Sequence, residues 1–124
     1  MPEENIEQPS INNVRSDEFV TCYANNIQFE SSIWDLKLLF GQVDFSAKPV
    51  AIEQHTAIAI PWLQAKLLAY YLLINIHIFE AENGKVAVPS SVAPQIPEAP
   101  TEDQRAVEFR EVALGIRREI LGIS

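Results

Sequence analysis

Few side chains in this 124-residue chain could take part in acid–base or metal chemistry. His55 and His77 are the two histidines, and Cys22 is the single cysteine. Glu53 precedes His55 by two residues, which would put both side chains on one side of a strand and could support a small metal-dependent enzyme. Two ligands are a weak signal for a metal centre, so we expect a structural role for His55.

The other candidates have simpler structural explanations. His77 lies three residues before Glu80, a spacing that suits a side-chain contact on one helix face. Cys22 has no basic neighbour in sequence that would favour its thiolate, so we expect it to be a small filler residue. The chain contains no glycine-rich phosphate loop and none of the short motifs of zinc peptidases or serine hydrolases. We therefore expect no enzyme activity, no metal and no cofactor.

The composition argues against several classes of partner. Acidic residues outnumber basic ones by 17 to 9, giving a formal net charge of −8, and no Lys/Arg cluster could neutralise a phosphate backbone. A nucleic-acid partner is therefore not expected. A single cysteine forms no intramolecular disulfide, and the first ten residues are acidic and polar where a signal peptide is basic and then apolar. These features favour a cytoplasmic location.

The segment from Ile60 to Glu80 is expected to form one long helix with two opposite apolar faces. At about 100° per residue, one face carries Ala65, Leu68, Ala69, Leu72, Ile76 and Phe79, and the other carries Leu63, Leu67, Tyr70, Ile74 and Ile78. A helix at the surface of a monomer needs only one apolar stripe, so we expect one face to pack on the chain's own sheet and the other on a partner chain. The run is long enough to cross a bilayer, but its polar interruptions would be costly in lipid, so we expect no membrane span.

Alternating apolar residues predict antiparallel strands before this helix. The first is expected to begin at Glu18 and the second near Trp34, with a hairpin turn at Ser31 and Ser32. The third strand is expected from Val50 to Ile60, with its even-numbered apolar residues on one side. The strand aromatics are expected to be core residues, namely Tyr23, Phe29, Trp34 and Phe40.

The sequence thus predicts an α+β protein with a three-stranded or four-stranded antiparallel sheet. Residues 1–17 are expected to be a mobile tail, 18–84 the sheet and long helix, 85–101 a proline-rich strap, and 102–122 a C-terminal helix. Thr101 and Gln104 resemble a capping box at the start of that helix. Its apolar residues recur at helical spacing: Phe109, Val112, Ala113, Ile116 and Ile120.

The run YANNIQFESSIWDLKLLFGQVD, residues 23–44, resembles a small bacterial family known as domain of unknown function 3467. The resemblance rests on the Tyr-Ala-Asn opening, the Trp34–Asp35 turn, the Phe40–Gly41 end, and a helix that begins near Pro61. It covers roughly residues 18–82. The resemblance implies a fold and no activity.

A weaker similarity to the SecB family of protein-export chaperones rests on the spacing of Tyr23, Ile27, Phe29 and Glu30. Those chaperones are acidic cytoplasmic tetramers, built from antiparallel sheets and a long helix, that bind unfolded chains in apolar grooves. This chain departs from them because three strands precede the long helix where four are expected, and a proline strap follows. The similarity therefore implies peptide binding only by analogy of fold.

We expect a homo-oligomer, dimer or tetramer, that binds unfolded or extended apolar polypeptide in a chaperone-like way. A structural or scaffold subunit of a larger assembly is the alternative, and a small metal-dependent enzyme is a third. The expected interface or binding surface consists of apolar helix residues and two tryptophans: Leu63, Leu67, Tyr70, Ile74, Ile78, Ala65, Leu68, Leu72, Ile76, Phe79, Trp34 and Trp62.

Overall fold

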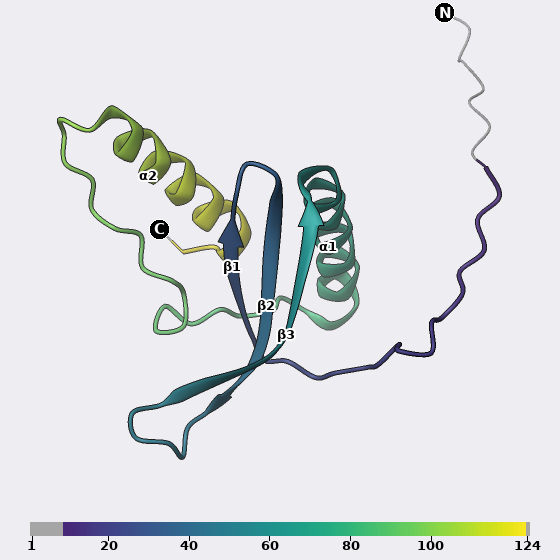
Figure 1. Cartoon of the computed structure of the whole chain (residues 1–124). Coiled ribbons are helices and arrows are strands. Elements are labelled where there is room, and N and C mark those ends of the chain that lie inside the picture. The colour runs from purple at the N-terminus through teal and green to yellow at the C-terminus, as the bar shows by residue number, and fades with distance from the viewer. Residues whose placement is uncertain (1–8, 124) are drawn as a thin grey trace, which may run out of the picture. The chain divides into compact units, whose positions relative to one another are not determined.

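The computed structural model describes residues 9–123, so the first eight residues of the expected tail lie outside the described residues. Strands β1 (Asn26–Ser31), β2 (Asp35–Asp44) and β3 (Ala51–Pro61) come first. Helix α1 (Trp62–Asn83) follows, and then helix α2 (Gln104–Ile116) with the π-helical turn η1 (Arg117–Leu121) (Figure 1). The α+β expectation is confirmed. Contacts divide the chain into two compact units, with the boundary inside α1 between residues 67 and 68.

The strands form one antiparallel sheet in the order β1-β2-β3, as the alternation predicts. β2 is the central strand, and it pairs with β3 over its whole length and with β1 over residues 36–41. Because paired residues share a face, this register gathers one set of apolar side chains on one side of the sheet. We call it the apolar face: Ile27, Phe29, Leu36, Leu38, Phe40, Ile58 and Ile60.

The first strand is shorter than predicted. β1 begins at Asn26, and residues 18–25 are not in strand conformation although their apolar side chains alternate. A strand needs a neighbouring strand to pair with as well as a suitable sequence pattern. Asn26 pairs with Gly41, and β2 ends at Asp44, so only three residues of β2 remain to pair with the segment before Asn26. The sequence pattern of residues 18–25 does not show that this pairing partner is missing.

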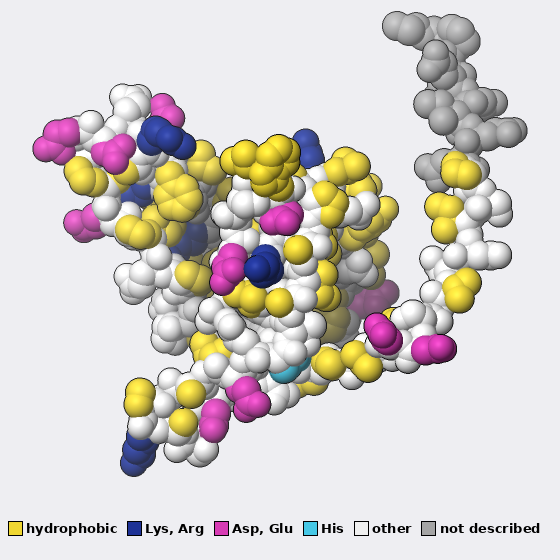
Figure 2. Space-filling view, viewed as in Figure 1, with side chains coloured by type: hydrophobic (Ala, Val, Ile, Leu, Met, Phe, Trp, Pro, Cys, Tyr) yellow, Lys and Arg dark blue, Asp and Glu magenta, His cyan; other side chains and the backbone are white. Residues whose placement is uncertain are grey.

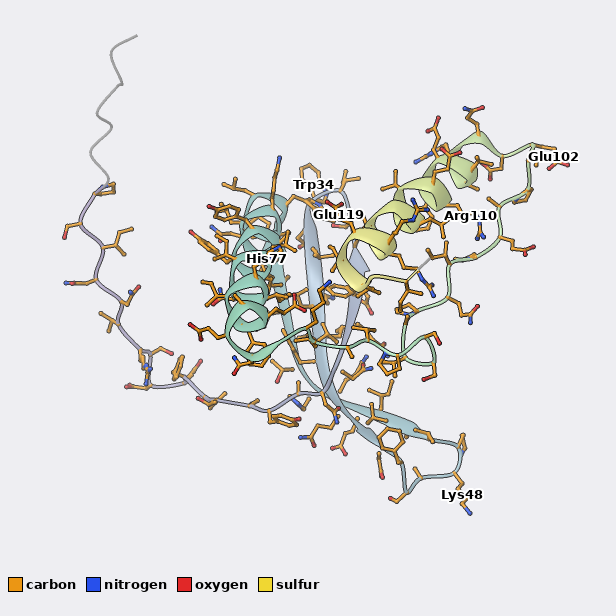
Figure 3. The ribbon with its side chains drawn as sticks, turned by 180° about the vertical axis from the view of Figure 1, so that it is seen from behind. Trp34, Lys48, His77, Glu102, Arg110 and Glu119 are labelled. Carbon is orange, nitrogen blue, oxygen red and sulfur yellow. The ribbon has the colours of Figure 1, made fainter. Side chains whose placement is uncertain are left out.

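A tight turn at residues 32–34 joins β1 to β2, close to where the two serines predict it. The Ser32 hydroxyl accepts hydrogen bonds from the backbone N–H groups of Trp34 and Asp35, each at 3.1 Å. The Ser32 N–H donates to the Asp35 carbonyl at 3.0 Å. Trp34 thus lies in the turn, 79% exposed, at the tip of the hairpin (Figure 3). The expectation that Trp34 is a core residue of the second strand is wrong.

The pairing of β2 with β3 contains a β-bulge. Phe40 lies opposite Thr56 and Gly41 opposite Gln54, so His55 is an extra residue without a partner on β2. Beyond the bulge the two faces of β3 exchange, which places Ile52 on the face opposite to the apolar face. The expectation that all even-numbered apolar residues of this strand lie on one side is wrong for Ile52.

Helix α1 follows β3 without a loop and ends close to its predicted bounds. Gly84 has a φ of 87°, the left-handed conformation expected after a helix end, and its N–H donates to the Glu80 carbonyl at 2.9 Å. The Glu80 carboxylate accepts the N–H of Val86 at 2.8 Å. Glu80 therefore fixes the start of the strap. The spacing of His77 and Glu80 predicts a contact between them, but no hydrogen bond or ion pair between described residues joins the two.

Helix α2 begins two residues later than predicted and has a different cap. Asp103 is the N-cap, and its carboxylate accepts the N–H of Ala106 at 3.1 Å. The expected capping box of Thr101 and Gln104 is wrong, because Gln104 is already the first helical residue. An aspartate at the cap satisfies a free N–H of the first turn and places negative charge at the positive end of the helix.

Arg110 of α2 and Arg117 of η1 hold the proline-rich strap. Arg110, labelled in Figure 3, donates from Nη1 to the carbonyls of Ile96 and Pro97 at 3.1 and 2.8 Å. Arg117 Nη1 donates to the Pro94 carbonyl at 2.8 Å. Proline has no N–H, and an extended proline-rich segment leaves its carbonyls unpaired. The guanidinium donors supply the missing partners, so strap and α2 are held together within the second unit.

The described residues bury very few apolar side chains. Leu38 in β2 and Ala93 in the strap, at 8% and 6% exposed, are the only buried hydrophobic residues in the described part of the chain. Apolar side chains are visible over much of the surface (Figure 2). Tyr23 and Phe29, which are expected from the sequence to be core residues, are 73% and 62% exposed. Within residues 9–123 the chain does not build the core that its 48% hydrophobic content predicts.

Candidate binding surfaces

Helix α1 exposes both of its apolar faces, and none of its residues is buried. Ala65 and Leu68 are the most covered of the residues expected to bind a partner, and they are half-buried. The other aliphatic residues of that set, together with Tyr70 and Phe79, are between 37% and 70% exposed: Leu63, Leu67, Tyr70, Leu72, Ile74, Ile76, Ile78 and Phe79. An apolar surface of this extent on one helix is typical of a protein–protein contact.

Polar groups on α1 are partly satisfied by the helix itself. The Asn75 amide donates to the Tyr71 carbonyl at 2.7 Å, one turn earlier. The Asn83 amide donates to the Phe79 carbonyl at 3.1 Å in the same way. Covering these positions with a partner therefore leaves fewer unpaired donors, which reduces the free-energy cost of burying them.

The structure brings the two tryptophans to the same end of the hairpin. The indole Nε1 of Trp62, at the start of α1, donates to the Ser32 carbonyl at 2.9 Å. Ser32 belongs to the turn that carries Trp34 and Ile33, which are 79% and 83% exposed. We call Ile33, Trp34 and Trp62 the hairpin tip. It is a second exposed apolar surface. The sequence predicts that both tryptophans belong to a binding surface, but not that they lie at the same end of the hairpin.

His55 has a structural role at the bulge. Its Nε2 lies 3.0 Å from the Tyr23 carbonyl oxygen and its Nδ1 lies 2.7 Å from the Thr56 hydroxyl oxygen. A carbonyl only accepts, so Nε2 carries a proton, and in the neutral imidazole Nδ1 accepts from the Thr56 hydroxyl. Both ring nitrogens are therefore engaged, which favours the structural interpretation of His55 over a metal pair with Glu53.

Asn25 and Gly41 complete the same cluster. The Asn25 side-chain oxygen accepts the N–H of Val43 at 2.9 Å, and the Asn25 N–H donates to the Gly41 carbonyl at 3.1 Å. A Cβ atom at Gly41 would lie 2.6 Å from the Glu53 carbonyl oxygen, so β3 approaches β2 here more closely than a side chain allows. Both residues belong to the motifs that resemble the family, but the sequence alone does not indicate this structural role.

Cys22 is exposed and does not fill a core. It lines a shallow, mostly apolar recess of about 280 Å³ whose other walls are Val20, Ala24, Phe40, His55, Thr56 and Ile58. Phe40 and Ile58 belong to the apolar face, so the segment before β1 covers one end of that face. The prediction that Cys22 is a small filler residue is wrong, because its side chain is exposed.

Charged groups in the described residues do not gather into a metal site. Among residues 9–123, no three His, Cys, Asp or Glu side chains are grouped so that they could hold a metal ion. The pKa of Asp44, the last residue of β2, is lowered by the hydroxyl and the N–H of Ser46, which stabilise its carboxylate. Of the helices that the structure describes, none is both long and apolar enough to span a membrane.

The fold and surfaces define a small α+β protein whose long helix and hairpin tip expose apolar side chains. The chain belongs to the family described as "Protein of unknown function (DUF3467)", whose sequence profile matches residues 1–88. The resemblance predicted from residues 23–44 is confirmed. No curated protein and no solved structure matches the chain, so the similarity to SecB is not shown.

The motifs that carry the family resemblance meet at two places in the first unit. Tyr23, Asn25 and Gly41 form the cluster at the bulge with His55. The Trp34–Asp35 turn is tied to the start of α1 by the hydrogen bond from Trp62 to Ser32. These residues therefore shape the sheet and its junction with α1. Most of the strap and all of α2 follow the matched region.

Proposed function

We propose that the chain is a non-enzymatic, oligomeric binding protein that holds extended apolar segments of other polypeptides in a chaperone-like way. The exposure of both apolar faces of α1, with no buried residue in the helix, is the observation that supports this proposal. Each of its half-exposed Leu, Ile and Phe side chains gains on the order of 1 kcal/mol when a partner covers the rest of its surface. The cytoplasmic location expected from composition stays a prediction.

The first partner that we propose for α1 is a second copy of the same chain, in a dimer or tetramer. A self-association surface needs a buried apolar centre without unpaired charges. The face around Leu72, with Ile76 and Phe79 one and two turns further along, meets this description. The opposite face around Leu67 and Ile74 and the hairpin tip then stay available for an extended client.

Light scattering on the full chain and one matched pair of variants tests the oligomer. Leu72→Glu places a charge in the apolar face, where Leu72 is 51% exposed in the single chain. It should lower the molar mass to that of a monomer without unfolding the chain. Gln64→Glu adds the same charge at an exposed polar position of α1 and should leave the molar mass unchanged. A monomeric unsubstituted chain at micromolar concentration contradicts the proposal.

A scaffold subunit is the alternative function, and an aggregation assay separates the two. A chaperone-like protein delays the aggregation of an unfolded test protein with little preference for its sequence. Leu63→Glu, at the most exposed position of the second face, should remove this effect while the oligomer persists. If the unsubstituted chain neither delays aggregation nor changes its tryptophan emission with the test protein, the scaffold function is the better explanation.

A further inference from the structure

A pocket of about 390 Å³ lies between the strap and the C-terminal helix, within the second unit. Seven residues line it: Pro94, Ile96, Ala113, Ile116, Arg117, Ile120 and Leu121. Arg117 is the only one with a polar side chain, and none is acidic, although the chain has 17 acidic residues. All seven follow residue 88, where the family match ends. The pocket therefore belongs to the segment that distinguishes this chain from the matched family region.

The guanidinium of Arg117 has an unused edge. Its Nη1 donates to the Pro94 carbonyl at 2.8 Å, whereas its Nε is shielded from solvent and has no partner among the described residues. A shielded N–H without an acceptor is unfavourable. The Nε and the second terminal nitrogen form one side of the planar group, and arginine holds a carboxylate from such a side with two parallel hydrogen bonds.

The backbone around the pocket is also unusual. Arg117, Ile120 and Leu121 lie in η1, the π-helical turn that ends the C-terminal helix. π-Helical turns are rare, and they occur frequently at functional sites. The turn thus supplies both the cation and part of the apolar wall.

We propose that this pocket binds a small amphiphilic carboxylate, with its head group on Arg117 and its apolar body against Ile116 and Ile120. The charge of the ligand follows from the single cation in a wall without acidic residues. Its size follows from the volume, which is near the lower end of the range of about 300–1,000 Å³ for ligand pockets, so a medium-length chain fits. This site is separate from the surfaces proposed for client binding, and either proposal can fail alone.

Isothermal titration of the full chain with three amphiphiles of equal length tests the head group. Decanoate should bind once per chain at concentrations below those at which it forms micelles. Decanol and decyltrimethylammonium should bind with an affinity lower by roughly tenfold or more, because they cannot accept both hydrogen bonds from Arg117. Equal binding of all three overturns the proposal, because it indicates general adsorption to exposed apolar side chains.

Two substitutions on one face of α2 test the location. Ala113→Leu adds volume inside the pocket and should weaken decanoate binding by roughly tenfold or more. Ala106→Leu, two turns earlier and outside the pocket, is the matched control and should leave binding unchanged. Unchanged binding to the Ala113→Leu variant, with its circular dichroism spectrum preserved, overturns the proposal.

Arg117→Lys keeps the positive charge but removes the planar edge of the guanidinium. It should weaken decanoate binding by roughly tenfold and leave the weak binding of decanol as it is. Because Arg117 also holds the strap, an equal loss for decanoate and decanol would indicate a collapsed pocket and no head-group recognition, which contradicts the proposal.

Discussion

The Nε2 atom of His55 lies 3.0 Å from the carbonyl oxygen of Tyr23, and this contact joins the extra residue of the β-bulge to the segment that precedes β1. The two residues are 32 positions apart in sequence. Asn25 and Gly41 lie beside them, so four residues that a motif search reads separately form one structural cluster. Substitutions in this cluster are expected to change the stability of the fold. Substitutions on the exposed apolar surfaces are expected to change binding.

Gly41→Ala should destabilise the sheet. The added Cβ would lie 2.6 Å from the Glu53 carbonyl oxygen, and neither strand can move without disturbing the ladder. Overpacking of this kind typically costs about 1–3 kcal/mol, which thermal unfolding followed by circular dichroism can measure. Gly115→Ala is the control, because nothing lies within 4 Å of a Cβ there and alanine favours the helix. Equal melting temperatures for the Gly41→Ala variant and the unsubstituted chain would contradict the close approach.

The order and direction of the main elements are predictable from the sequence because local patterns determine them. The periods of two and of 3.6 residues locate three strands and two helices, and Gly84 marks the end of α1. The start of β1 and the bulge at His55 are not predictable in this way, because both depend on what the neighbouring strand offers. One extra residue in β3 reverses the face of Ile52 while the sequence alternation continues unchanged.

Asp103→Ala should destabilise α2 while Thr101→Ala should not. Asp103 accepts the N–H of Ala106, and loss of such an N-cap typically costs about 1 kcal/mol. Thr101 is exposed and precedes the cap by two residues. Amide hydrogen exchange of residues 104–108 in the two variants is the measurement. Faster exchange in the Thr101→Ala variant than in the Asp103→Ala variant would restore the capping box that the sequence suggests.

Ser46→Ala should raise the pKa of Asp44. The Ser46 hydroxyl and N–H stabilise the carboxylate and lower this pKa from its ordinary value of 3.8. A lowered pKa in the folded state means that the contribution to stability is present above the ordinary value and is lost as the pH falls through the lower, folded value. NMR titration of the Asp44 carboxyl carbon in both proteins measures the change, with Ser90→Ala in the strap as the control. An unchanged pKa in the Ser46→Ala variant would contradict the assigned cause.

The candidate surfaces are only partly predictable from the sequence. Two apolar faces on α1 are visible in its periodicity, and the helix has no buried residue, so what covers either face stays a prediction. The hairpin tip is not visible, because Trp34 reads as a strand residue until the Ser32 turn is known. The pocket beside Arg117 is hidden for the same reason, since it depends on which strap carbonyls Arg110 of α2 and Arg117 of η1 bind.

Trp62→Phe should weaken the junction between the hairpin and α1 and leave Trp34 as a reporter of binding. The substitution keeps an aromatic ring but removes the indole donor to the Ser32 carbonyl, a loss expected to cost about 1 kcal/mol. Trp34→Phe changes a side chain that is 79% exposed, so its effect on unfolding should stay within about 0.5 kcal/mol. In the Trp62→Phe variant the remaining emission should be that of a solvent-exposed indole. It should shift to shorter wavelength when an unfolded test protein covers the hairpin tip. Larger destabilisation by Trp34→Phe than by Trp62→Phe would contradict the assigned hydrogen bond, and an unshifted emission in the presence of bound client would remove the hairpin tip from the binding surface.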